Sequence, residues 1–197
     1  MKLCFPASLI GRRSGSVCHR AVRSIGGRCG PGWHRRPQCY GRSVARPVAT
    51  STVVDRDGLL SFIRPRHQSV LGTTRADGSL QLSPVTMGVD PAGTILIASY
   101  PERAKSRNLR RRPQATVCVL SDGFTGEWVQ VSGAASVVDV PEAVDGLVAY
   151  YRSISGEHGD WDEYRQAMID QGKALIRIVP DRWGPISKGG FPSRLVD

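Results

Sequence analysis

The feature that most constrains this chain is a series of short apolar segments, separated by turn signals, between residues 67 and 179. The expected strands span residues 67–74, 80–89, 94–99, 115–120, 127–138 and 174–179. Asp77 and Gly78 supply the positive φ angles of a tight hairpin turn between the first two. Pro84 marks a bulge or an edge in the second, because proline donates no ladder hydrogen bond. Short turns between consecutive strands predict an antiparallel barrel rather than a doubly wound parallel sheet.

The helical segments are grouped and do not alternate with the strands. They are expected to begin at or near Asp55, Glu102, Asp139 and Asp160. The three aspartates have short side chains that can cap a first turn, and Gly172 is the expected end of the last helix. The pattern as a whole predicts a mainly-β (α+β) chain with helices appended to the barrel.

Charge separates the N-terminal quarter of the chain from the rest. Residues 1–50 contain ten Lys or Arg and no Asp or Glu, and beyond them 17 basic residues balance 17 acidic ones. We expect residues 1–52 to form a basic, disordered leader. Residues 53–197 are expected to form one cofactor-binding domain that does not bind nucleic acid. Three alternatives stay open for the leader: an organellar transit peptide, translation from a start codon too far upstream, and binding of nucleic acid.

Residues that the chain lacks argue against several classes of site and location. Four of its five cysteines lie in the first 39 residues without a Cys-x-x-Cys pair, and its four histidines are far apart, so no metal site is expected. Cys118 sits in an apolar segment, where cysteine usually behaves as a small buried hydrophobe. No apolar run is long enough to span a bilayer and no signal peptide is recognised, so the expected location is cytoplasmic, with no membrane partner.

A run of cations lies between the third and fourth expected strands. Residues 103–112 contain six Lys or Arg and no carboxylate. Because a helix is expected to start here, its free N–H groups would lie beside these cations and form an anion site. Arg103 and Lys105, nearest the strand exit, are the candidate phosphate ligands. Arg110 to Arg112 are expected to complement the helix C-terminus and stay solvated.

Motifs for other chemistries are absent from the sequence. The chain has no glycine-rich dinucleotide fingerprint, no P-loop and no nucleophile elbow. No nucleophile or acid–base pair stands out, so the catalytic residues are unknown from sequence. An anion site on an apolar barrel without reactive side chains is typical of an enzyme whose reactive group is a bound cofactor.

Three segments, residues 73–85, 103–111 and 151–168, resemble the pyridoxamine 5′-phosphate oxidase-like split-barrel superfamily. Within it, the chain is most similar to the actinobacterial oxidoreductases that use the deazaflavin coenzyme F420. The resemblance runs from about residue 55 to 192, and the leader has no counterpart in the family. It implies a six-stranded antiparallel split β-barrel that forms a homodimer, with two cofactor sites in the grooves between subunits.

The resemblance also implies the residues of the cofactor site. Arg103, Lys105 and Asn108 would contact the phosphate and the tail, and Ser99, at the end of the preceding strand, is a further candidate. The ring would be lined by residues of one strand and one loop: Gln81, Ser83, Pro84, Val85 and Trp128. The loop that carries Trp128 would come from the second subunit. Close relatives often carry Asn where this chain has Pro84, so no side-chain hydrogen bond to the ring is expected there.

The leading hypothesis is therefore an F420-dependent oxidoreductase. It would transfer a hydride from reduced F420 to an electron-poor double bond of a small conjugated substrate, with the proton taken from solvent. One alternative is an FMN-dependent pyridoxamine 5′-phosphate oxidase-like enzyme of the same fold. Another is a non-enzymatic carrier of F420, FMN or a tetrapyrrole. Cofactor binding and turnover discriminate among the three.

Overall fold

The structure of the protein is a computed structural model, and it describes residues 47–195. The sheet consists of β1 (Thr50–Thr52), β2 (Gln68–Thr74), β3 (Leu80–Thr86), β4 (Gly88–Val89), β5 (Ile95–Ser99), β6 (Gln114–Leu120), β7 (Glu127–Asp139), β8 (Ala174–Trp183) and β9 (Ile186–Lys188). The helices are α1 (Arg56–Ile63), α2 (Ala104–Arg111), α3 (Val144–Ser155), α4 (Trp161–Asp170) and the single 3-10 turn η1 (Ser193–Leu195). Most of the expected leader, residues 1–46, lies outside the described residues.

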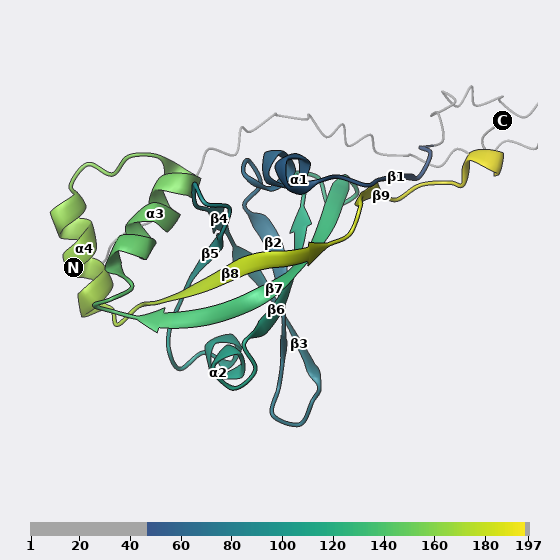
Figure 1. The fold of residues 1–197 in the computed structure, drawn as a ribbon. Coiled ribbons are helices and arrows are strands. Elements are labelled where there is room, and N and C mark those ends of the chain that lie inside the picture. Colours follow the sequence, from purple (N-terminus) through teal and green to yellow (C-terminus); the bar gives the residue numbers. More distant parts are fainter. Residues whose placement is uncertain (1–46, 196–197) are drawn as a thin grey trace, which may run out of the picture. The chain divides into compact units, whose positions relative to one another are not determined.

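The sheet is antiparallel and curls until its two ends meet. Its strand order is β3-β2-β6-β7-β8-β5-β4, so β3 and β4 stand at opposite ends. Only Met87 separates these two strands in the sequence. One residue cannot span a flat sheet, so the sheet must close into a barrel, and β3 accordingly also contacts β5. Figure 1 shows this curled sheet with α3 and α4 together on one side of it. The expected antiparallel barrel with appended helices is confirmed.

The number of strands differs from the six that were expected. The segment expected as one strand over 80–89 breaks into β3 and β4, and β3 is an edge strand of the main path, in agreement with Pro84. The segment expected to end at residue 179 continues to Trp183. Two further strands, β1 and β9, pair with each other, and β9 also pairs with β7. β1 therefore extends the folded domain by several residues before its expected start at residue 53.

The hydrophobic core fills the inside of the barrel. Residues at alternate positions on β2, β6 and β7 are fully buried, including Leu71, Val117 and Val131. α1 adds apolar side chains to this core, beginning at the N-cap Asp55, whose carboxylate accepts from the Gly58 N–H at 2.8 Å. The residues between these buried positions face the opposite side of the sheet, which stays open in the single chain.

A β-bulge distorts the sheet between β7 and β8. The register shifts at Gly133, where Ser132 pairs with Arg182 and Gly133 pairs with Pro180, so Asp181 has no partner on β7. A Cβ atom at Gly133 would lie 2.0 Å from the carbonyl oxygen of Val179, so only glycine fits here. Bulges bend a strand and redirect the side chain of the extra residue.

The two C-terminal helices pack against β5 and β8 through a second, smaller core around Leu96, Leu147 and Leu175. The expected cap at Asp160 is confirmed, because its side chain accepts from the N–H groups of residues 162 and 163. The expected cap at Asp139 is wrong. The N-cap of α3 is Ala143, and the Asp139 carboxylate instead accepts from the Arg110 guanidinium at 2.6 Å.

Candidate functional site

The N-terminus of α2 has features that suit the binding of an anion. Arg103 is its N-cap, no side chain caps the first turn, and the first turn contains no acidic residue. The first N–H groups of a helix have no partner within the helix, and together they carry a partial positive charge. The guanidinium of Arg103 and the ammonium of Lys105 add two full charges beside them. A phosphate or carboxylate would satisfy these donors and offset their mutual repulsion.

Lys105 is held in an environment that disfavours its charge. Partial burial lowers the pKa of its ammonium below 10.5, and the neighbouring Arg103 lowers it further. A bound anion would oppose both effects, because an opposite charge favours the protonated form. The pKa shift therefore supports the same conclusion as the open helix terminus.

A third cation lies beside this helix terminus. The ammonium of Lys173 is 4.0 Å from the centre of the Tyr100 ring, and the Arg103 guanidinium is 5.8 Å from the centre of the same ring. The pairing of Ser99 with Ala174 explains this, because Tyr100 and Lys173 are the next residues beyond that pair. Lys173 was not among the residues expected from sequence, because strand pairing and not spacing brings it here.

Asn108 and Gln81 are linked in a buried hydrogen-bond network. Asn108 is only 3% exposed, and its amide donates to Thr73 Oγ1 at 3.1 Å and to Gln81 Oε1 at 3.0 Å. Its own oxygen accepts from the Arg111 guanidinium at 2.8 Å. Every polar atom of the Asn108 side chain is thus engaged within the protein. This geometry fits a residue that positions Gln81 and Arg111 better than one that touches a ligand.

Ser99, at the end of β5, is hydrogen-bonded to the first turn of α2. Its hydroxyl lies 3.0 Å from that of Ser106, and Ser106 Oγ donates to the carbonyl of Tyr100 at 2.7 Å. Both serines are buried. The first turn of α2 is therefore held against the strand that precedes it, which fixes the position of Arg103 and Lys105.

Strand alternation divides the residues expected to line a ring. Gln81 reaches the Asn108 network, and Val85 packs against the barrel core, so Gln81, Ser83 and Val85 share the inner face of β3. Pro84 is exposed on the outer face, as are Leu80 and Leu82. A single chain therefore does not present the whole segment 81–85 to one ligand.

Trp128 lies in a different part of the sheet. It is 39% exposed at the start of β7, and together with Phe124 and Lys188 it lines a hollow of about 560 Å³. β2 and β6 separate β7 from β3, so the structure of one chain does not bring Trp128 to the Gln81–Val85 segment. The expected contribution of this loop from a second subunit stays a prediction.

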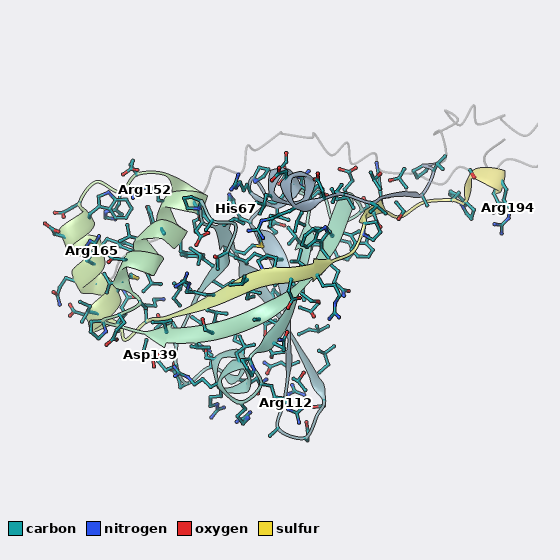
Figure 2. The ribbon with its side chains drawn as sticks, viewed as in Figure 1. His67, Arg112, Asp139, Arg152, Arg165 and Arg194 are labelled. Atoms are coloured by element: carbon teal, nitrogen blue, oxygen red, sulfur yellow. The ribbon has the colours of Figure 1, made fainter. Side chains whose placement is uncertain are left out.

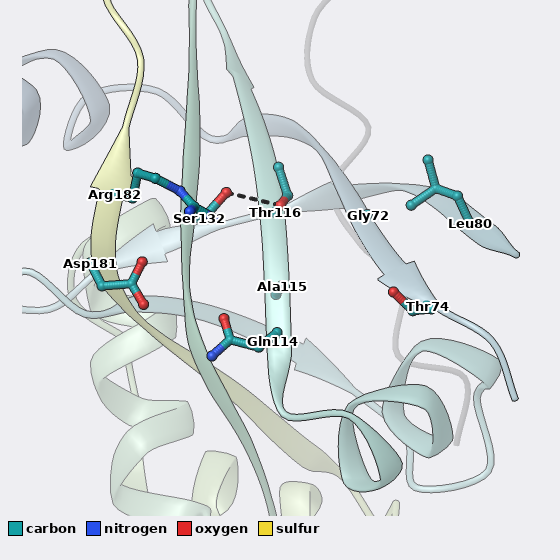
Figure 3. Close-up of a pocket in the computed structure, with 9 residues that line it drawn as sticks. All are labelled: Gly72, Thr74, Leu80, Gln114, Ala115, Thr116, Ser132, Asp181 and Arg182. Atoms are coloured by element: carbon teal, nitrogen blue, oxygen red, sulfur yellow. Dashed lines mark hydrogen bonds between the residues drawn. The ribbon is translucent and has the colours of Figure 1, made fainter. Parts of the chain in front are cut away.

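The open face of the sheet holds a polar hollow of about 660 Å³ (Figure 3). Thr116 on β6 and Ser132 on β7 are hydrogen-bonded at 2.9 Å on its floor. Asp181, the residue set free by the bulge, and Gln114 turn toward this hollow from opposite sides of β7. Asp181 was not among the residues expected from sequence, because its position depends on the bulge between β7 and β8.

The helix-end arginines are more engaged than expected. Arg110 pairs with Asp139, and Arg111 binds Asn108, so neither is simply solvated. Within residues 47–195, no helix is long and apolar enough to cross a bilayer. The same residues contain no group of three or more His, Cys, Asp or Glu side chains that could hold a metal ion.

Comparison with known proteins identifies the family. The model of the pyridoxamine 5′-phosphate oxidase family matches residues 56–187. A conserved hypothetical protein of Mycobacterium tuberculosis has a similar structure, with a TM-score of 0.58, 23% identity, and coverage of 69% of this chain and 86% of that one. A candidate 5-nitroimidazole antibiotic resistance protein of Bacteroides thetaiotaomicron gives a TM-score of 0.57 at 16% identity, covering 74% of this chain and 92% of that one. The heme storage protein HutZ of Vibrio cholerae gives a TM-score of 0.50 at 17% identity, covering 68% of this chain and 96% of that one.

The three similar structures are all below 25% identical to this chain, so they show only that the fold is shared. The match to the family model shows that the chain is related to the family. The matched residues run from α1 to β9 and include the barrel and the open N-terminus of α2. The chain therefore belongs to the pyridoxamine 5′-phosphate oxidase family.

Proposed function

We propose that the chain is an F420-dependent oxidoreductase in which the N-terminus of α2 holds the phosphate of the cofactor. The observation that supports this most is the open first turn of α2, which lacks a capping side chain and an acid and is flanked by Arg103 and Lys105. These residues fit a phosphate group in both charge and donor geometry. When bound, the deazaflavin supplies a hydride for the reduction of an electron-poor double bond.

The protein's own residues have binding and positioning tasks in this proposal. Arg103 and Lys105 bind the phosphate, and the Ser99–Ser106 contact keeps them in place. Asn108 orients Gln81, whose amide N–H groups stay available on the inner face of β3. No side chain is assigned as acid or base, and solvent supplies the proton. The choice of F420 over FMN rests on the resemblance of residues 103–111 and 151–168 to the F420-dependent branch.

The proposal includes a homodimer formed through the open face of the sheet. Leu80 and Leu82 are each 63% exposed on the outer face of β3, which is an edge strand of the main sheet path. Exposed apolar side chains on a sheet edge usually mark an interaction site. A partner that covered this face could bring its own Trp128 loop to the cofactor.

A side-by-side titration of the full-length protein with F420 and with FMN tests the proposed cofactor. Saturable quenching of F420 fluorescence, with weaker binding of FMN, is the expected result. Tight FMN binding without F420 binding would replace the proposal by the FMN-dependent alternative. Stopped-flow oxidation of reduced F420 against enones, quinones and biliverdin then separates an enzyme from a carrier, since a carrier shows no turnover with any of them.

A charge on the outer face tests the dimer separately. Leu82→Lys places a cation on the exposed face and removes no core contact, so folding should be retained. Sedimentation should show a dimer for the wild-type protein and a monomer for the variant. A wild-type protein that sediments as a monomer at all concentrations would exclude this part of the proposal.

A further inference from the structure

A cavity lies between α1 and α3, away from α2. Its volume of about 360 Å³ falls within the range of small-molecule sites. Three elements line it, namely the C-terminal end of α1, the turn between β4 and β5, and the middle of α3. In the view of Figure 1, α1 and β4 lie above β7 and β8, and α2 lies below them. No residue of α2, of β3 or of the loop that carries Trp128 borders this cavity, so it is separate from the proposed cofactor site.

The wall of the cavity is apolar because small residues of α3 face the barrel here. A Cβ atom at Gly88 would overlap the hydroxyl of Ser153, so α3 touches the backbone of β4 at this point. One turn earlier on the same face of α3, Ala149 has only a methyl group to fill the space. Val89, which is 8% exposed, and Pro91 complete the apolar wall. An apolar body that entered this space would release water from the wall, which favours binding.

One cation borders this apolar wall without a carboxylate partner. The guanidinium of Arg64, the C-cap of α1, donates to the carbonyl of Pro91 at 3.1 Å, and this bond holds it at the wall. Arg64 forms no ion pair within residues 47–195. Its other guanidinium N–H groups have no hydrogen-bond partner in the same part of the chain, so they can bind a ligand.

The other charged groups at the cavity are already engaged. Arg152 pairs with Glu157 at 2.6 Å, so its charge is balanced within the protein. The Asp90 carboxylate accepts from the N–H of Thr94 at 2.8 Å, which holds it against its own turn. Arg64 is therefore the group at this cavity that is free to bind an opposite charge.

The β4–β5 turn that carries part of the wall is held in place by two arginines of α1. The Arg56 guanidinium donates to the carbonyl of Ala92 at 2.7 Å, and Arg64 donates to the neighbouring carbonyl of Pro91. The wall and the guanidinium of Arg64 are thus preorganised. Preorganised donors bind a ligand at a lower entropic cost than free surface side chains do.

We infer that this cavity binds a small monocarboxylate with an apolar body, a class of ligand different from the redox cofactor. The guanidinium of Arg64 matches the two oxygens of a carboxylate, and the apolar wall receives the body. A carboxylate fits better than a phosphate, because the nearby Asp90 repels a doubly charged anion more strongly than a singly charged one. The inference does not depend on the identity of the redox cofactor.

Isothermal titration of the full-length protein with octanoate, octan-1-ol and acetate tests the site. Octanoate should bind saturably and more tightly than the other two probes, because octan-1-ol lacks the charge and acetate lacks the apolar body. Octanoate affinity should be unchanged in the double variant Arg103→Ala with Lys105→Ala, since the α2 terminus is a separate site. In the wild-type protein, the methyl resonances of Val89 and Ala149 should shift as octanoate saturates, which locates the ligand in the cavity.

A pair of matched variants then tests the role of the charge. Arg64→Gln should weaken octanoate binding by about tenfold or more, as expected for the loss of a charge-assisted hydrogen bond, and leave octan-1-ol binding unchanged. Arg56→Gln is the control, because Arg56 lies on the same helix and binds the same turn but does not line the cavity. Thermal unfolding of both variants measures the effect of losing a bond to the turn.

The inference is overturned if octanoate does not bind saturably, or if octan-1-ol binds as tightly as octanoate. It is equally overturned if Arg64→Gln binds octanoate as tightly as the wild type, or if Arg56→Gln or the double variant at the α2 terminus loses as much affinity as Arg64→Gln. Methyl resonances of Val89 and Ala149 that do not respond to octanoate would also exclude it. Failure of F420 to bind would not affect these results, so the proposed cofactor and the proposed carboxylate site can fail independently.

Discussion

Two regions of the molecule are rich in arginine, and they differ in how many of these arginines pair with a carboxylate: in α2, Arg110 pairs with Asp139 but others do not. In the α3–α4 hairpin, Arg152 pairs with Glu157 at 2.6 Å, and Arg165 pairs with Asp145. Around α2, by contrast, Arg103 and Arg107 have no carboxylate partner among the described residues. Figure 2 shows Arg152 and Arg165 on the hairpin, well separated from Arg112 at the end of α2.

The hairpin also places one of its ion pairs beside a cluster of rings. Tyr151, His158, Trp161 and Tyr164 lie with ring centres 5.1–5.9 Å apart. The Arg152 guanidinium sits 4.7 Å from the centre of the Trp161 ring, and the Trp161 N–H donates to Glu157 at 3.1 Å. Arginines that are matched by acids and aromatics therefore join elements of the fold in the hairpin, whereas the unmatched arginine at the open end of α2 is proposed to bind a ligand.

The largest effect is expected from removing the unmatched charges at the α2 terminus. Arg103→Ala with Lys105→Ala should weaken F420 binding more than tenfold, because each charge-assisted hydrogen bond contributes about 1.5–3 kcal/mol. Fold stability should change little, because neither cation has a carboxylate partner to lose among the described residues. Fluorescence titration and thermal unfolding measure the two effects. Arg165→Ala is the control from the paired region, and unchanged F420 affinity in the double variant would refute the placement of the site.

In the ring cluster, a substitution is expected to lower stability and to leave F420 affinity unchanged. Trp161→Ala should lower the free energy of unfolding by about 1–3 kcal/mol, since it removes several ring contacts and the bond to Glu157. Its F420 affinity should equal that of the wild type, because α4 does not reach the α2 terminus. Urea denaturation provides the measurement, and Trp161→Phe, which keeps a ring, should recover part of the loss. A Trp161→Ala variant that is as stable as the wild type but binds F420 more weakly would contradict this prediction.

A pH dependence is expected from Lys105. Its pKa lies below 10.5 in the free protein, and a bound anion raises it again. Affinity for the phosphate should therefore be constant near neutral pH and fall as the pH rises through the lowered pKa, where the free ammonium loses its proton. F420 titrations at increasing pH check this. In Lys105→Arg the fall should disappear, since the guanidinium stays charged.

A spectroscopic signature is expected from the ring cluster. Burial raises the pKa of Tyr164 from 10.0 to about 12, with a further contribution from Tyr150 and Tyr151. The folded protein then holds this proton after the unfolded chain has lost it, so stability declines as the pH rises from 10 to 12. Burial also raises the pKa of Tyr150, so absorbance titration of the phenols should show a late component that is smaller in Tyr164→Phe. Ionisation of all tyrosines in one step would speak against this environment.

The smallest effect is expected at the exposed ion pair of the hairpin. The hydrogen bond from Arg152 lowers the pKa of Glu157 below 4.5, with a smaller contribution from Trp161. This stabilisation is complete above the unfolded pKa and is lost as the pH falls through the lowered one. Glu157→Gln should therefore melt slightly earlier than the wild type at pH 7. The two melting curves should converge in acid, and a difference that persists there would exclude the ion pair as its source.

The sequence predicted local elements well, because their signals are carried by neighbouring residues. The caps at Asp55 and Asp160 were confirmed, and so was the edge position of Pro84. At the hairpin turn only Gly78 has a positive φ, whereas Asp77 does not and its carboxylate accepts from Ser79 instead. Asp139 was misassigned because its acidic side chain satisfies a capping pattern, but Arg110, distant in sequence, binds it in the fold. β1 and β9 were overlooked because three-residue strands carry little periodicity and depend on each other for their pairing.

For the site, the sequence by itself determined the density of positive charge in residues 103–112 and the absence of acids among them. Only the tertiary structure decided what each of these charges does. Strand pairing brings Lys173 to Tyr100, the β2–β3 hairpin brings Arg75 to Arg107 and Arg111, and a buried hydrogen bond turns Asn108 inward. Charge is a property of composition and can be counted along the chain. Whether a charge finds a partner depends on contacts between residues far apart in the sequence, and those arise only when the sheet closes.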